Sequence, residues 1–259
     1  MKSKLFKDEV ILITGTSSGL GKALAYEFAR NGANVILFDK EFELSSQIAN
    51  ELTKNFNKCL AISGDVTKDG DLENAVLEGV KNFGKIDIIV ANAGFGVPGD
   101  FENLKLEDYK KQFETNVFGV LRTIYAGLPE IKKTKGSICI IGSVGGYVSF
   151  APGSSAYVMS KFAIRGLARP LWLELSKYNI SVTHIMPGPM DTNFNHTNDL
   201  IKKLGLSKMK PEKAARLILS AIKNKKFEVV ITSYGKLVVF IQKYFPFLFK
   251  IIYKKIKNK

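Results

Sequence analysis

Short apolar runs alternate with segments of helical periodicity along most of this 259-residue chain. Strands are predicted at Val10–Thr14, Asn34–Asp39, Cys59–Ser63, Ile86–Ala91, Gly136–Gly142, Ile180–Met186 and Phe227–Thr232. Helices are predicted at Gly21–Asn31, Ser45–Phe56, Asp69–Phe83, Leu106–Ile131, Ser154–Tyr178 and Pro211–Lys223. Strands that are apolar on both faces and alternate with helices form a parallel sheet covered on each side. The pattern therefore predicts an α/β, Rossmann-like, doubly wound fold of about seven parallel strands with helices on both faces.

The composition changes near the C-terminus. We expect one domain over residues 1–235, because no linker, repeat or low-complexity segment interrupts the pattern, and a basic, hydrophobic tail over residues 236–259. The tail holds seven lysines and no acidic residue among many apolar side chains, and Pro246 is expected to start or kink a helix. Its apolar stretches are too short to span a bilayer. Three alternatives fit this composition: an interfacial helix on anionic lipid, docking on the body or on a partner subunit, and disorder.

Charge and cysteine content exclude several kinds of partner. Half of the formal net charge of +14 lies in the tail, and the rest of the chain carries 31 basic and 24 acidic residues. Since the body has no basic stripe with interleaved aromatics, we expect no nucleic-acid partner. Cys59 and Cys139 give neither a disulfide framework nor metal-ligand spacing, so we expect no metal site. With no signal peptide at the start, we expect a cytoplasmic protein, peripheral at the inner membrane face if the tail binds lipid.

A glycine-rich turn follows the first predicted strand and opens the first helix. The segment Thr14–Gly21 has the spacing G-x-x-x-G-x-G. Glycines in this position let the backbone approach a pyrophosphate, while serine hydroxyls and helix N-terminal amides donate hydrogen bonds to the anion. The turn therefore predicts a dinucleotide site, and its candidate residues are Gly15, Ser17, Ser18, Gly19, Leu20 and Gly21.

The end of the second predicted strand bears on the choice of dinucleotide. Asp39 lies 18 residues after Gly21, where a carboxylate accepts hydrogen bonds from an adenosine ribose and repels a 2′-phosphate. Lys40 follows at once and could bind a 2′-phosphate instead. The two residues argue in opposite directions, so the cofactor is NAD(P), with a slight preference for NAD.

Tyr157 and Lys161 are four residues apart in a predicted helix and therefore share one face. A phenol near pKa 10 is a poor base at neutral pH, and a neighbouring ammonium is expected to lower that pKa. A pKa nearer the working pH suits general acid–base catalysis. Ser143, 14 residues upstream at a strand exit, can donate a hydrogen bond to a substrate oxygen. Together these residues point to the transfer of a hydride to or from a nicotinamide, with Tyr157 moving the proton.

These motifs in this order resemble the classical short-chain dehydrogenase/reductase family from about Val10 to Thr232. The resemblance implies catalytic roles for Asn116, Ser143, Tyr157 and Lys161, with Asn116 holding a water that relays protons to Lys161. It implies that Asp65 and Val66 hold the adenine, that Asn92, Ala93 and Gly94 line the cofactor, and that Pro187, Gly188 and Thr192 seat the nicotinamide. Ala91 replaces an asparagine often found there, which is a mild departure. A homodimer or homotetramer is also implied.

The substrate is expected to be a hydrophobic carbonyl or alcohol that is lipid-like, steroid-like or acyl, held by Ser143 and Tyr157. Apolar residues lie on several loops beside the predicted site, although they could instead face the core: Phe95, Tyr147, Val148, Phe150, Met190 and Phe194. His184 is expected to be packed or hydrogen-bonded within its strand. A nucleotide-sensing protein without turnover is the alternative from another class. Ser143 argues against it, because binding alone would not require that hydroxyl.

Overall fold

The fold is described from a computed structural model over residues 4–148, 152–192 and 208–249. Expectations that concern Phe150, Phe194 and the last ten residues of the tail lie outside the described residues. Every predicted strand and helix is found within the described parts of the chain, with small shifts at the ends.

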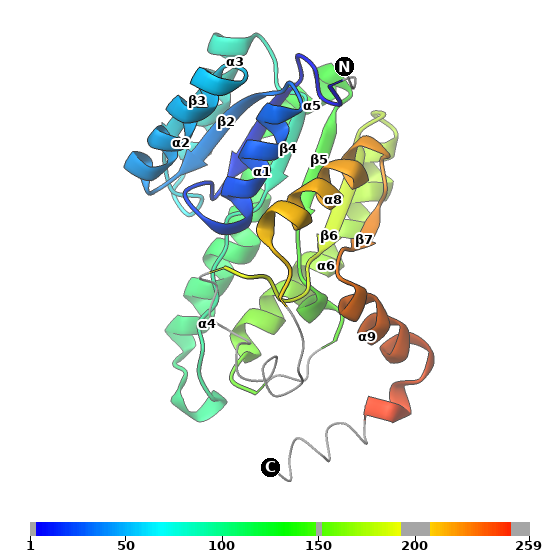
Figure 1. The fold of residues 1–259 in the computed structure, drawn as a ribbon. Helices are drawn as coiled ribbons and strands as arrows, with labels where there is room; N and C mark the ends of the chain where they lie inside the picture. Colours follow the sequence, from blue (N-terminus) through cyan, green and yellow to red (C-terminus); the bar gives the residue numbers. More distant parts are fainter. Residues whose placement is uncertain (1–3, 149–151, 193–207, 250–259) are drawn as a thin grey trace.

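The seven strands form one parallel sheet in the order β3-β2-β1-β4-β5-β6-β7, which confirms the predicted class (Figure 1). The order reverses at β1, where a doubly wound sheet places its ligand crevice. The strands are β1 (Val10–Thr14), β2 (Asn34–Asp39), β3 (Cys59–Ser63), β4 (Ile88–Ala91), β5 (Ser137–Ile141), β6 (Ser181–Met186) and β7 (Glu228–Val230).

Two apolar clusters lie on the two faces of the sheet. In β1 the side chains of Ile11 and Ile13 join one cluster, and those of Val10 and Leu12 join the other, as the twofold alternation of a strand requires. One face is covered by α1 (Gly19–Arg30), α2 (Phe42–Asn55) and α8 (Pro211–Lys223), and the other by α3 (Asp71–Phe83), α5 (Gly119–Thr134) and α6 (Ser155–Ser176). Because both faces are buried, the strands read as continuous apolar runs.

The helical region predicted at Leu106–Ile131 contains an irregularity. The chain forms α4 (Leu106–Phe113), then a π-helical turn at Glu114–Phe118, then α5. Within the turn the amide of Gly119 donates to the carbonyl of Glu114, five residues back. A π turn inserts one extra residue into a helix and is often found at functional sites. It places Asn116 inside the fold, with its side chain fully buried.

Helix α9 (Ser233–Tyr244) begins within the predicted domain and continues into the tail. The Thr232 hydroxyl caps it by accepting from the amide of Gly235 at 3.2 Å. Pro246 follows the end of α9, in agreement with its expected effect on helices. None of the helices in the described ranges is both long enough and apolar enough to cross a membrane.

Candidate functional site

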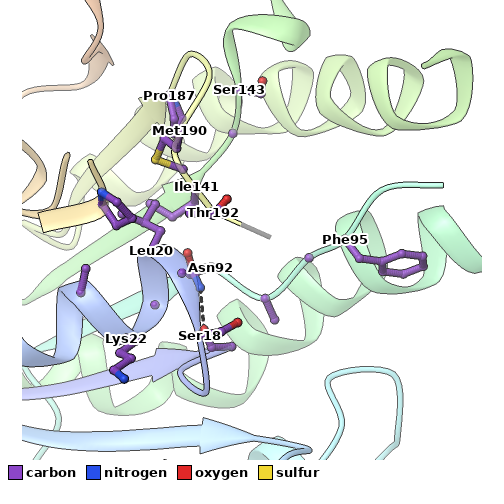
Figure 2. Close-up of a pocket in the computed structure, with 18 of the residues that line it drawn as sticks. Ser18, Leu20, Lys22, Asn92, Phe95, Ile141, Ser143, Pro187, Met190 and Thr192 are labelled. Carbon is purple, nitrogen blue, oxygen red and sulfur yellow. Dashed lines mark hydrogen bonds between the residues drawn. The ribbon is translucent and has the colours of Figure 1, made fainter. Parts of the chain in front are cut away.

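A cavity of about 1480 Å³ lies along the carboxyl edge of the sheet, beside β1, β4 and β5 (Figure 2). All of the residues predicted to hold a cofactor line it, and so do Ser143, Tyr157 and Lys161. Among the predicted catalytic and cofactor-binding residues, all of which are described, Asn116 alone does not line it. Ser18 and Ser143 lie at opposite ends of the drawn pocket in Figure 2, so the phosphate turn and the predicted reaction centre are separated along its length.

The phosphate turn is held by the backbone and by one asparagine. Gly15 has a φ of +74°, and a Cβ there would lie 2.9 Å from the Cα of Ala93. The amide group of Asn92 donates to the carbonyls of Thr14 and Gly15 at 2.9 and 3.0 Å. The hydroxyl of Thr14 accepts from the amides of Asn92 and Ala93, at 3.1 and 3.0 Å. The turn is thus tied to the exit of β4, and glycine is required where the two backbones approach.

The start of α1 fits an anionic group. Ser18 precedes the helix in an extended conformation and its side chain makes no capping hydrogen bond. The first turn of a helix has backbone amides without intrahelical partners, and these amides bind phosphate. Together with the close backbone approach at Gly15, these amides fit the pyrophosphate of a dinucleotide.

Asp39 lies at the end of β2 and is nearly fully buried. Its carboxylate accepts from the backbone amide of Ser17 at 2.7 Å and from that of Glu41 at 2.9 Å. The carboxylate is therefore fixed beside the phosphate turn, whereas Lys40 is exposed at the edge of the cavity. Asp65 is similarly fixed, since its carboxylate accepts from the amide of Thr67 at 2.9 Å.

Tyr157, Lys161 and Ser143 meet at the other end of the cavity. Tyr157 and Lys161 come from successive turns of α6, and the Lys161 Nζ lies 5.7 Å from the centre of the Tyr157 ring. The Lys161 ammonium donates to the carbonyl of Ile141, the last residue of β5, at 3.0 Å. The Ser143 hydroxyl accepts from the amide of Gly145 at 2.9 Å and is hydrogen-bonded to Tyr157.

The pKa of Tyr157 shifts in the direction opposite to the sequence-based expectation. Burial raises it to about 12, and the hydrogen bond with Ser143 acts in the lowering direction without offsetting that effect. Burial also lowers the pKa of Lys161 to about 8. The physical reason is that Lys161 directs its ammonium to a backbone carbonyl, while desolvation disfavours the charged form of both groups. A spacing of four residues fixes the shared face but not the direction of the ammonium.

The Asn116 side chain holds a loop and the catalytic helix. It accepts from the amide of Phe95 at 3.0 Å and donates to the carbonyl of Phe95 at 2.8 Å and to the Ser160 hydroxyl at 3.1 Å. Ser160 in turn donates to the carbonyl of Tyr157 at 2.7 Å. Asn116 thereby connects the loop after β4 to the backbone of Tyr157. This arrangement does not test its expected role in holding a water near Lys161.

Sequence reasoning missed Gln112, which is fully buried on α4. Its side chain accepts from the amide of Val97 at 2.7 Å and donates to the carbonyl of Phe95. Gln112 and Asn116 are four residues apart and hold the same loop. The spacing of four residues between Gln112 and Asn116 could have indicated that both lie on the same helix face. A polar residue in an amphipathic helix is, however, ordinarily assigned to the solvent side.

The expected nicotinamide segment follows β6. The carbonyl of Pro187 accepts from the amide of Val144 at 2.9 Å, which connects this segment to the turn after Ser143. Gly188 packs against the Thr232 side chain, and Met190 forms a bridge to Met209. Thr192, the last described residue before residue 208, lines the cavity.

The expected substrate residues divide into two groups. Phe95, Val148 and Met190 line the cavity, whereas Tyr147 does not and stacks against the guanidinium of Arg165 at 3.9 Å. Sequence reasoning did not include Tyr234 from α9, which also lines the cavity. His184 is buried in β6, with Nδ1 3.6 Å from a carboxylate oxygen of Glu228, so it is packed away from the cavity.

The comparison with known proteins gives a family. A model of the family described as short chain dehydrogenase matches residues 9–201. The oxidoreductase UcpA of Salmonella typhimurium is 39% identical over 182 residues, which cover 70% of this chain and 69% of that relative.

Solved structures resemble the whole domain. An alcohol dehydrogenase from the archaeon Thermococcus sibiricus, complexed with 5-hydroxy-NADP, is 29% identical with a TM-score of 0.77 and covers 86% of this chain and 95% of its own. A 3-ketoacyl-(acyl-carrier-protein) reductase from Brucella melitensis, complexed with NADH, is 25% identical with a TM-score of 0.80 and covers 87% and 98%. One neighbour holds an NADP derivative and the other NADH, which supports NAD(P) in general.

Proposed function

This chain belongs to the short-chain dehydrogenase family, and from that premise we propose that Tyr157 is the general acid and base of its hydride transfer. As a member of that family, the protein is an NAD(P)-dependent oxidoreductase that acts on alcohols or carbonyls. The observation that carries the proposal is the meeting of Tyr157, Ser143 and Lys161 at one end of the cavity. The phosphate turn lies at the other end, so one extended dinucleotide fits between them.

The chemistry of the site supports reduction. A bound nicotinamide supplies or accepts the hydride. Because burial raises the pKa of Tyr157 to about 12, the phenol keeps its proton at neutral pH, and a proton donor is what the oxygen of a reduced carbonyl needs. Ser143 lines the same cavity, and in this proposal its hydroxyl donates to that oxygen and stabilises the developing charge. Oxidation of an alcohol would use the same groups in reverse, with Tyr157 accepting the proton.

Lys161 is proposed to bind the cofactor ribose and so orient the nicotinamide. Lys161 lines the cavity, and its ammonium keeps donor capacity beyond the hydrogen bond to Ile141, since an ammonium carries three donors. For the dinucleotide itself we propose NAD, because the fixed carboxylate of Asp39 lies where a 2′-phosphate would be repelled. Exposed Lys40 is the feature that opposes this choice.

The substrate is proposed to be a hydrophobic carbonyl compound or alcohol. Phe95, Val148, Met190 and Tyr234 add apolar side chains to the cavity lining, and Val148 and Tyr234 belong to the same apolar cluster as Val144, next to Ser143. Two measurements test the proposal: dissociation constants for NADH and NADPH, then turnover of short polar and long apolar ketones with the cofactor that binds more tightly. We expect a clear preference for the apolar set. Preference for the polar set would exclude this substrate class without affecting the reaction type.

A cofactor-sensing protein without turnover is the competing outcome. It would bind NADH or NADPH yet consume neither with any ketone or alcohol in the panel. Dissociation constants alone do not separate the two functions, so turnover by the wild-type chain is the deciding readout.

We propose that the chain assembles as a homodimer or homotetramer in the cytoplasm. Exposed apolar side chains on α5 and α6, among them Tyr125 and Leu173, support self-association. Mass photometry of the chain at several concentrations would test this, and a monomer throughout would contradict it. Contact of the tail with a membrane surface is a separate proposal.

A further inference from the structure

Helix α9 has an apolar face that the rest of the described chain leaves uncovered. Leu237, Phe240 and Tyr244 follow the i, i+3, i+7 spacing of one helix face and are 56%, 51% and 56% exposed. Phe245 and Phe247 extend the face beyond the end of the helix and are also exposed. These five residues are called the α9 patch below.

The aromatic rings of the α9 patch contact one another. The Phe240 ring centre lies 4.9 Å from that of Tyr244 and 6.1 Å from that of Phe245, and Phe245 lies 6.3 Å from Phe247. Single exposed apolar residues are ordinary on protein surfaces, but a contiguous group marks a site of interaction. The opposite face of the helix is used by the fold, since Val238 is buried against Val144 and Met186.

Charge distinguishes a lipid surface from a protein partner. Lys236 and Lys243 are seven residues apart on α9, next to the patch, and both are exposed. Five more lysines and no acidic residue follow in the sequence to residue 259. Protein–protein interfaces are depleted of lysine, whereas helices that lie on anionic bilayers combine lysines with aromatic and aliphatic side chains.

The same helix forms part of the cavity wall. Tyr234 lines the cavity, and Leu237 follows it by three residues, a rise of about 4.5 Å along a helix. Tyr234 and Val238 belong to the same apolar cluster as Val144, the residue after Ser143. In Figure 1, α9 leads from β7 away from the sheet, so its far end is available for contact.

We infer that the α9 patch docks on an anionic lipid surface and brings the reaction end of the cavity next to the bilayer, from which the apolar substrate enters. The docking is inferred from the residues of the α9 patch and its neighbouring lysines alone, whereas entry of the substrate from the bilayer rests on the proposed function. Described helices do not span a membrane, so the contact is peripheral.

The first experiment measures vesicle binding by the full chain. Vesicles of phosphatidylcholine with about one-third phosphatidylglycerol are sedimented with the wild type, and vesicles of phosphatidylcholine alone serve for comparison. We expect binding to the anionic vesicles that weakens as salt is raised. Leu237→Gln/Phe240→Gln should weaken the binding about tenfold or more, because two apolar side chains no longer leave water.

Two control variants match the tested ones. Leu77→Gln/Leu217→Gln removes exposed leucines from α3 and α8 and should leave vesicle binding unchanged. Lys236→Gln/Lys243→Gln should reduce binding to anionic vesicles, while Lys54→Gln/Lys213→Gln, which removes exposed lysines elsewhere, should not. Failure of the wild type to bind anionic vesicles overturns the inference, as does equal binding by the patch variant and its control. Loss of self-association in the patch variant with vesicle binding unchanged would identify a second copy as the occupant and overturn it too.

The second experiment measures turnover of one long-chain ketone dissolved in the vesicles and of one short, water-soluble ketone. The patch variant should be slower than wild type with the vesicle substrate and equal to it with the soluble one. Equal rates with both substrates would overturn substrate entry from the bilayer. If the wild type turns over neither ketone, the proposed function fails, and vesicle sedimentation still decides the docking.

Discussion

The two ends of the cavity are built in different ways. At the nucleotide end, the phosphate turn is fixed by backbone hydrogen bonds, by Asn92 and by the close approach of Gly15 to Ala93. At the reaction end, side chains define the surface: Ser143, Tyr157, Val148 and Tyr234. This difference indicates which substitutions should change cofactor binding and which should change the rate of turnover. Changes at the nucleotide end should alter folding and cofactor affinity, and changes at the reaction end should alter turnover and substrate choice.

The largest effect in this comparison is expected at the reaction end. Ser143→Ala removes a donor to the substrate oxygen and should lower kcat by about 10²–10³-fold. Fluorescence titration should give a dissociation constant for NADH that changes by less than about threefold. Ser220→Ala, an exposed serine on α8, is the matched control and should behave as wild type. A large loss of NADH affinity in Ser143→Ala would break the proposed division between the two ends.

The nucleotide end should respond to an added methyl group. Gly15→Ala forces a left-handed backbone on alanine and a contact at 2.9 Å with Ala93. It should lower the free energy of unfolding by about 1–3 kcal/mol and weaken NADH binding about tenfold or more. Gly166→Ala is the control, because the residue is helical and nothing beyond its adjoining residues and the nearby backbone of its own helix lies within 4 Å of a Cβ there. It should raise the free energy of unfolding by about 0.5–1 kcal/mol. Equal unfolding curves for the two variants would contradict the claim that glycine is required at position 15.

Asp39 should decide cofactor choice without affecting the chemical step. Asp39→Ala removes the charge that repels a 2′-phosphate and leaves Lys40 in place, so the ratio of NADPH to NADH dissociation constants should fall about tenfold. Measurement of both constants in wild type and variant checks this. Asp69→Ala, at an exposed carboxylate outside the cavity, is the control and should leave the ratio unchanged. If the ratio of NADPH to NADH dissociation constants were unchanged in Asp39→Ala, residues other than Asp39 would determine the choice of dinucleotide.

Lys161 lies at the reaction end, and its burial should appear in the pH dependence of stability. Burial lowers the pKa of Lys161 in the folded chain to about 8, from its ordinary value of 10.5. Between these values the unfolded chain binds more protons, so stability from this group increases as pH rises and is lost as pH falls through about 8. The difference in free energy of unfolding between wild type and Lys161→Met should therefore shift in favour of wild type across this window, by up to about 3 kcal/mol. A flat difference would show that Lys161 is not desolvated.

The sequence predicts the strands well and the irregular features poorly, for physical reasons. Val10–Thr14 and Asn34–Asp39 are predicted with the observed bounds because continuous apolar runs mark strands buried on both faces. The π turn at Glu114–Phe118 is not predictable from periodicity, since one inserted residue leaves the apolar pattern of a long helix nearly unchanged.

In the candidate site, too, some features are predictable from the sequence and others are not. Apart from Asn116, the candidate residues of the family motifs line the cavity, because motif and backbone path are linked at the strand ends. The role of Gln112 and the direction of the Lys161 ammonium depend on which groups approach from other elements, which spacing along one helix cannot give. For the same reason the pKa shift of Tyr157 was predicted in the wrong direction.

The central claim is that Tyr157 delivers the proton of a hydride transfer. The most direct test is single-turnover oxidation of bound NADH by an apolar ketone, followed by the loss of NADH absorbance in wild type, Tyr157→Phe and the control Tyr125→Phe on α5. We predict that Tyr157→Phe slows this step by about 10²–10⁴-fold while the NADH dissociation constant changes by less than about threefold, and that Tyr125→Phe matches wild type. A Tyr157→Phe rate within about threefold of wild type would contradict the claim.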